Sequence, residues 1–147
     1  MTATASALSF YGIKVTPDEL LRKCDSRGWD RHELETIDRI IESYGIKDES
    51  GYSYTMAQIK QHLKDGNPVI IHGMFTSSGH IVGVYGIDEE KGLWYVHDPA
   101  GKWDPDYHYG GPNWKSGEGV WYGSAWFTSK AAPDGKCWAH LLNKKKK

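Results

Sequence analysis

Residues 79–87 read GHIVGVYGI, and residues 92–99 read GLWYVHDP. Their β-branched and aromatic side chains predict strands over 80–85 and 92–97, and the polar segment 86–91 between them predicts a hairpin. In an antiparallel hairpin the start of one strand lies beside the end of the next. We therefore expect His80 and Asp98, eighteen residues apart in the chain, to come together in space.

The rest of the chain divides into helices before this hairpin and strands around it. Helical signals cover 1–11, the stretch that starts at Thr16-Pro17, residues 34–44, and the stretch that starts at the capping box Thr55–Gln58. Strand signals cover 68–73, 120–127 and 138–142, and residues 101–119 are rich in Gly, Pro and Asp, as in a long loop. Helices followed by antiparallel strands indicate an α+β fold in one domain, residues 1–143, with a lysine tail at 144–147.

Composition narrows the classes of function. The chain has 147 residues and a formal net charge of −1, so we expect no nucleic-acid partner, and no segment has the apolar length of a membrane span. The two cysteines, Cys24 and Cys137, are too few and too far apart for a disulfide framework, and none of the seven histidines forms a zinc-type pair. We expect no metal site and no cofactor.

His80 and Asp98 are the candidate catalytic pair. His80 follows a flexible segment, 76–79, and Pro99 holds Asp98 extended. A carboxylate on one ring nitrogen would fix the tautomer and leave the other nitrogen as a base. The plainer alternative is a histidine at a loop end and a turn-forming Asp-Pro that share no role, which the spacing alone favours.

Several motifs together make the whole chain resemble the papain-like cysteine peptidases related to the bacteriocin double-glycine leader peptidases, family C39. They are LSFYGI (8–13), GNPVIIHG (66–73), SGHIV (78–82), VHDP (96–99) and PDGKCW (133–138). The resemblance implies a papain-like fold, with N-terminal helices packed on an antiparallel sheet. It also implies that His80 is the general base and that Asp98 orients it.

The resemblance predicts the family's nucleophilic cysteine at a position before the first residue of the given sequence. Laying residues 1–12, MTATASALSFYG, on the family pattern puts the cysteine two positions before Met1, and the oxyanion-hole side chain further upstream. Loss of a triad nucleophile typically costs about a millionfold in turnover, so we expect the chain as given to be inactive. Thr2, as an N-terminal nucleophile, is the remote alternative.

Three hypotheses follow. The first is an N-terminally truncated enzyme that cleaves an amide bond in a peptide or in cell-wall peptidoglycan, of phage or bacterial type and directed outside the cell or to its envelope. The second is a pseudo-peptidase that binds cell wall or a protein partner. The third is a structural subunit of a phage particle or toxin complex. Aromatic residues in or near the long loop are the candidate substrate contacts: Trp103, Tyr107 and Trp114, with Tyr109 and Trp121 beside them.

Overall fold

The computed structural model describes residues 1–30, 33, 35–76, 79–106, 108–112 and 114–144. Within this part of the chain there are five helices: α1 (Thr2–Phe10), α2 (Pro17–Arg27), α3 (Glu35–Ser43), α4 (Met56–Lys64) and α5 (Ser124–Ala131). The strands are β1 (Ile46–Tyr54), β2 (Val69–Gly73), β3 (His80–Asp88), β4 (Leu93–His97), β5 (Val120–Gly123) and β6 (Cys137–Lys144). They form one antiparallel sheet in the order β1-β6-β2-β3-β4-β5, which confirms the α+β prediction.

The local signals that start the helices are present in the structure. The Thr16 hydroxyl accepts a hydrogen bond from the Glu19 N–H at the start of α2, and Gly28 ends that helix in the left-handed conformation. Thr55 and Gln58 form a reciprocal capping box at the start of α4. These two helices begin where the sequence predicts.

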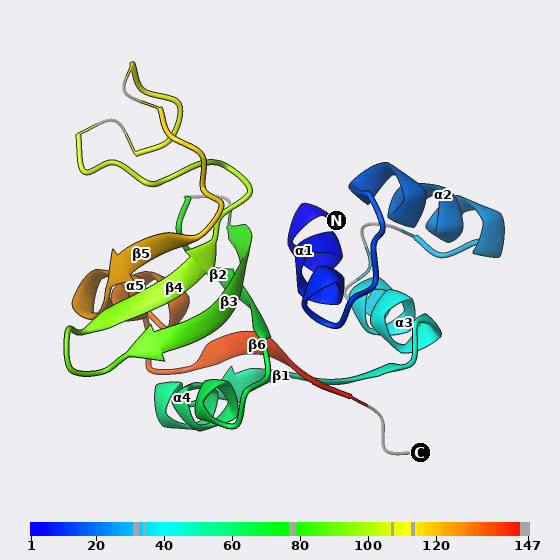
Figure 1. Cartoon of the computed structure of the whole chain (residues 1–147), viewed down its shortest axis with the longest axis horizontal. Helices are drawn as coiled ribbons and strands as arrows, with labels where there is room; N and C mark the ends of the chain where they lie inside the picture. The colour runs from blue at the N-terminus through cyan, green and yellow to red at the C-terminus, as the bar shows by residue number, and fades with distance from the viewer. Residues whose placement is uncertain (31–32, 34, 77–78, 107, 113, 145–147) are drawn as a thin grey trace.

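The sheet separates two hydrophobic cores (Figure 1). On one face α4 and α5 pack against alternate residues of the central strands, such as Val69 and Ile71. On the other face α1, α2 and α3 form a helical layer against Ile70 and Leu142. The long loop 98–119 projects from the end of β4 and β5, so the site at this end is built from loop and strand termini.

Three details differ from the sequence predictions. β1 was not predicted, because an edge strand with one partner carries mostly polar, exposed residues and lacks an apolar alternation. Residues 124–127 are helical rather than extended, since Phe127 and Ala131 are buried four residues apart on one face of α5. Lys144 pairs with Ile46 as the last residue of β6, and residues 145–147 lie outside the described residues.

Among the described residues, none of the helices combines the length and the apolar character that crossing a bilayer requires.

Candidate active site

The hairpin of β3 and β4 brings His80 and Asp98 together. His80 is the first residue of β3, and Asp98 directly follows the last residue of β4. The Nε2 atom of His80 lies 2.6 Å from Oδ1 of Asp98. The Asp98 side chain is fully buried, while that of His80 is 17 % exposed. The carboxylate is thus sealed in the protein, and the imidazole reaches the surface.

Asp98 accepts three further hydrogen bonds besides the one from His80. The Tyr109 and Tyr122 hydroxyls each donate to Oδ2 at 2.8 Å, and the Ala100 N–H donates to Oδ1 at 3.1 Å. A carboxylate offers about four acceptor positions, so the acceptor capacity of Asp98 is filled. A buried carboxylate held by four donors cannot rotate away from the imidazole without breaking several bonds.

Both tyrosine hydroxyls have raised pKa values, which suits them to donate hydrogen bonds to Asp98. Burial raises the pKa of Tyr109, and the negative charge of Asp98 raises it further. Burial also raises the pKa of Tyr122, a residue of β5, with Asp98 acting in the same direction. Both hydroxyls therefore keep their protons at neutral pH.

The sequence does not predict this role of the tyrosines. It places Tyr109 only beside the candidate substrate contacts, and it does not single out Tyr122. The available signal was the alternation of β5, which turns Val120 and Tyr122 inward.

The backbone of the long loop closes over Asp98 at Gly117. The Asp98 N–H donates to the Gly117 carbonyl oxygen at 2.8 Å. A Cβ atom on Gly117 would collide with the Asp98 carbonyl oxygen, so only glycine fits this approach. The end of the loop thereby fixes the backbone that carries the carboxylate.

The second ring nitrogen of His80, Nδ1, has no hydrogen-bond partner among the described residues. The ring stands edge-on to Phe75 and Tyr109, with centroids 6.3 and 5.4 Å away. His80 also lines a cavity of about 520 Å³ whose other walls include Tyr52, Met74 and Trp138. One nitrogen is held by Asp98, and the other is left to exchange a proton.

The first turns of α1 face Asp98 from the helical layer. Thr2, Ser6 and Asp98 line a second cavity, of about 480 Å³, whose lining does not include His80. The Tyr85 hydroxyl donates to the Ser6 hydroxyl at 2.8 Å and ties β3 to α1. The N-terminal end of α1 therefore opens onto the space beside Asp98.

Neither cysteine of the chain is positioned to act as the nucleophile. Cys24 lies on α2 in the helical layer, Cys137 begins β6 in the opposite core, and both are fully buried. Burial raises the pKa of the Cys137 thiol to about 12. A protonated, buried thiol is a poor nucleophile.

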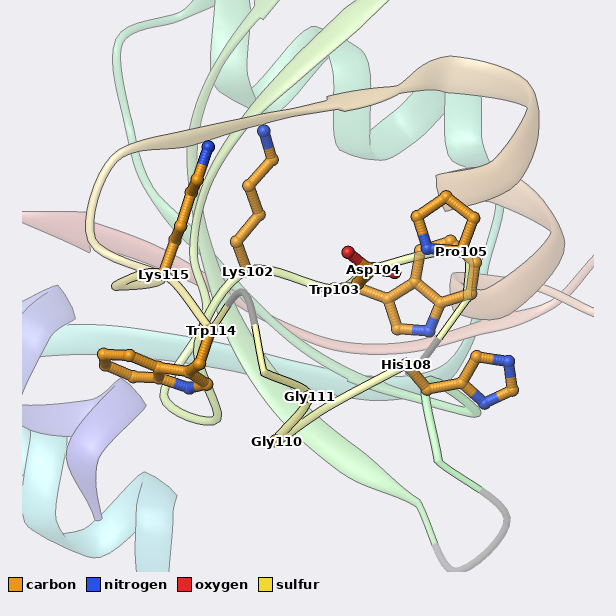
Figure 2. Close-up of a pocket in the computed structure, with 9 residues that line it drawn as sticks. All are labelled: Lys102, Trp103, Asp104, Pro105, His108, Gly110, Gly111, Trp114 and Lys115. Carbon is orange, nitrogen blue, oxygen red and sulfur yellow. The ribbon is translucent and has the colours of Figure 1, made fainter.

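Two of the loop aromatics, Trp103 and Trp114, line a third cavity, of about 560 Å³, whose lining includes neither His80 nor Asp98 (Figure 2). Trp103 packs on Trp126 with ring centroids 4.3 Å apart, whereas Trp114 is 57 % exposed and also lines the cavity beside Asp98. Tyr107, the third candidate substrate contact, lies outside the described residues.

The profile of the Peptidase_C39-like family matches residues 1–125. A search of curated proteins found no match. Among solved structures, the chain is similar to a double-glycine motif protease from an AMS/PCAT transporter, solved with its leader peptide (TM-score 0.62, 20 % identity, 97 % of this chain and 81 % of that chain).

It is similar to the same degree to the peptidase domain of Streptococcus ComA, a bifunctional ABC transporter of a quorum-sensing pathway (TM-score 0.62, 17 % identity, 97 % of this chain and 88 % of that chain). At these identities the two structures establish the fold, and the profile match over most of the chain establishes the family. The chain belongs to the Peptidase_C39-like family.

Proposed function

We propose that residues 1–144 belong to a thiol-hydrolase domain that cleaves an amide bond in a peptide, with His80 as the general base and acid and Asp98 as the residue that orients it. The 2.6 Å contact between His80 Nε2 and a carboxylate already held by three other donors carries the proposal. Membership of a peptidase-like family supports it.

The chemistry needs a thiolate, which neither buried cysteine supplies. The family pattern puts it two positions before Met1, where the end of α1 opens beside Asp98. The thiolate would attack the carbonyl carbon of the substrate, and His80 would give a proton to the departing amine. Water, deprotonated by His80, would then release the acyl group from the sulfur.

The proposed substrate is an extended peptide. The similar protease from the PCAT transporter was solved with a leader peptide, and its relationship to this chain supports the same class of ligand here. The cavity beside His80 offers Met74, Pro133 and Trp138 for apolar contacts. A peptide stem of the cell wall is the competing substrate, and a substrate panel separates the two.

A second candidate function is a pseudo-peptidase that binds peptide without cleaving it. One observation favours it: both cysteines in the printed sequence are buried. In that case the cavity beside His80 would serve for recognition alone, and the chain would bind peptides without cleaving them.

The decisive experiment supplies the thiol. We would add Cys-Asn directly before Met1, behind a short leading tag, and measure the rate at which iodoacetamide alkylates the new cysteine at pH 7. An imidazole that faces the thiol raises its thiolate fraction. We expect alkylation about tenfold faster than in the same protein with His80→Ala. His108→Ala, an exposed loop histidine, is the matched control.

Turnover is read in parallel with quenched-fluorescent peptides that carry Gly-Gly before the scissile bond and with purified peptidoglycan. Cleavage of the peptides alone supports the proposed substrate, and release from peptidoglycan alone replaces it with the cell-wall alternative. Equal alkylation rates with and without His80 would show that the imidazole does not serve this position, and would overturn the hydrolase proposal in favour of the binding function.

A further inference from the structure

A second group of acidic and basic side chains lies between the helical layer and the sheet and shares no residue with the His80 pair. It comprises Asp38 on α3, Asp48 on β1 and His140 on β6. The Nδ1 atom of His140 lies 2.9 Å from Oδ1 of Asp38 and 2.9 Å from Oδ2 of Asp48. One atom from each residue falls within 4.8 Å of the others. We call these three residues the Asp38 cluster.

The Asp38 cluster sets two carboxylates against one imidazole, so it carries excess negative charge when both carboxylates are ionised. The Asp48 side chain is fully buried and that of His140 is 2 % exposed. One imidazole faces both carboxylates, and Oδ1 of Asp48 is buried with no hydrogen-bond partner among the described residues. A buried carboxylate oxygen that has lost its water and gained no donor is destabilised. A further positive group beside the two carboxylates would therefore stabilise the cluster.

The residues behind the cluster hold two of its members in place. Nε2 of His140 lies 2.8 Å from Nε2 of His72, whose ring stacks on Trp138 at 3.9 Å between centroids. The Ser50 hydroxyl donates to Oδ2 of Asp38 at 2.9 Å. Histidine and carboxylate ligands of metal ions usually have such outer partners, which fix the tautomer and the direction of the ligand atom.

The cluster also has an opening. Asp38, whose side chain is 29 % exposed, and His140 line a small cavity of about 110 Å³ together with Glu35, Ser50 and Tyr52. This space admits several water molecules. It provides both a path for an ion and room for the water ligands that complete a coordination shell.

We propose that Asp38, Asp48 and His140 bind a divalent transition-metal cation through two carboxylate oxygens and the Nδ1 atom of His140, which would release its proton to water as the metal binds. Two carboxylates and one imidazole suit ions of the Mn²⁺ to Zn²⁺ series, with water in the remaining positions. The cation would neutralise the excess charge and give the unpartnered oxygen of Asp48 a ligand, directly or through a bound water. It would also join α3 to β1 and β6, and so fasten the helical layer to the sheet.

The test uses the whole chain without a histidine tag, stripped of metal with EDTA and then dialysed. MnCl₂ and ZnCl₂ are titrated separately, binding is followed by calorimetry, and Mn²⁺ is also followed by electron paramagnetic resonance. We expect one site per chain and a higher midpoint of thermal unfolding in the presence of the metal that binds. The Asp48→Asn variant keeps the shape of the side chain and should weaken binding at least tenfold.

Glu35→Gln is the matched control, because Glu35 lines the same cavity without belonging to the cluster. It should leave the affinity within about twofold. If Asp48→Asn fails to fold, as judged by circular dichroism, Asp38→Asn replaces it at the more exposed carboxylate. Absence of binding of either metal at 1 mM, or equal affinity in the wild type and the aspartate variants, would show that the cluster holds only protons and would overturn the proposal.

Discussion

The described part of the chain contains two histidine–aspartate groups with opposite proportions of donors and acceptors. At the His80 pair, one carboxylate accepts hydrogen bonds from four donors. At the Asp38 cluster, one imidazole faces two carboxylates, and one buried oxygen of Asp48 has no partner among the residues that the structure describes. A carboxylate whose acceptor positions are all hydrogen-bonded can hold a neighbouring base in position. Carboxylates that outnumber their donors favour the binding of a cation. Residue type alone does not distinguish these outcomes.

The sharpest test of this difference is Asp98→Asn. The amide removes the charge and one acceptor atom, and its NH₂ group faces donors that already point at this position. We expect the free energy of unfolding to fall by about 2–4 kcal/mol, because buried donors lose a charged partner. Urea denaturation followed by tryptophan fluorescence measures it. Asp106→Asn, on an exposed residue of the same loop, is the control and should stay within about 0.5 kcal/mol.

Gly117→Ala tests the backbone that supports the donor-rich pair. The added methyl group would collide with the Asp98 carbonyl oxygen, so the loop must shift. We expect a loss of about 1–3 kcal/mol in urea denaturation, typical of overpacking. Gly123→Ala is the comparison, since a Cβ there meets nothing within 4 Å. A smaller effect at Gly117 than at Gly123 would show that the loop does not hold Asp98.

Substitution of the two tyrosines tests whether they hold Asp98 independently or together. Tyr122→Phe removes a donor to Asp98 and leaves the Trp103 N–H, which donates to the Tyr122 hydroxyl at 2.8 Å, without its acceptor. We expect about 2 kcal/mol for Tyr122→Phe and about 1 kcal/mol for Tyr109→Phe. A double-mutant cycle in urea reports their coupling, and strict additivity would contradict a common role at Asp98.

The smallest effect is expected at the acceptor-rich cluster. Asp48→Asn in metal-free protein removes one of two facing carboxylates, while Asp38 still accepts from His140. We expect the free energy of unfolding to change by less than about 1 kcal/mol, in contrast to the same substitution at Asp98. A loss as large as that of Asp98→Asn would mean that the cluster is already balanced without a cation.

Local rules predicted much of the fold. The capped helices that begin after Thr16 and Thr55, the buried strand 69–73 and the hairpin that joins His80 to Asp98 follow from short-range signals. Those signals act within a few residues, so the sequence carries them directly. Short-range signals did not predict β1 and α5. The strand that pairs with β1 and the strands against which α5 buries its side chains lie elsewhere in the chain.

The sequence by itself therefore determined the first four helices, the central hairpin and the meeting of one imidazole with one carboxylate. Only the tertiary structure decided what surrounds them. It brought Tyr122 from β5 and Tyr109 from the long loop to Asp98, and it gathered Asp38, Asp48 and His140 from three elements. The physical reason is that the balance of donors, acceptors and charge in a buried site is set by strand order and helix packing, which join residues up to 102 positions apart.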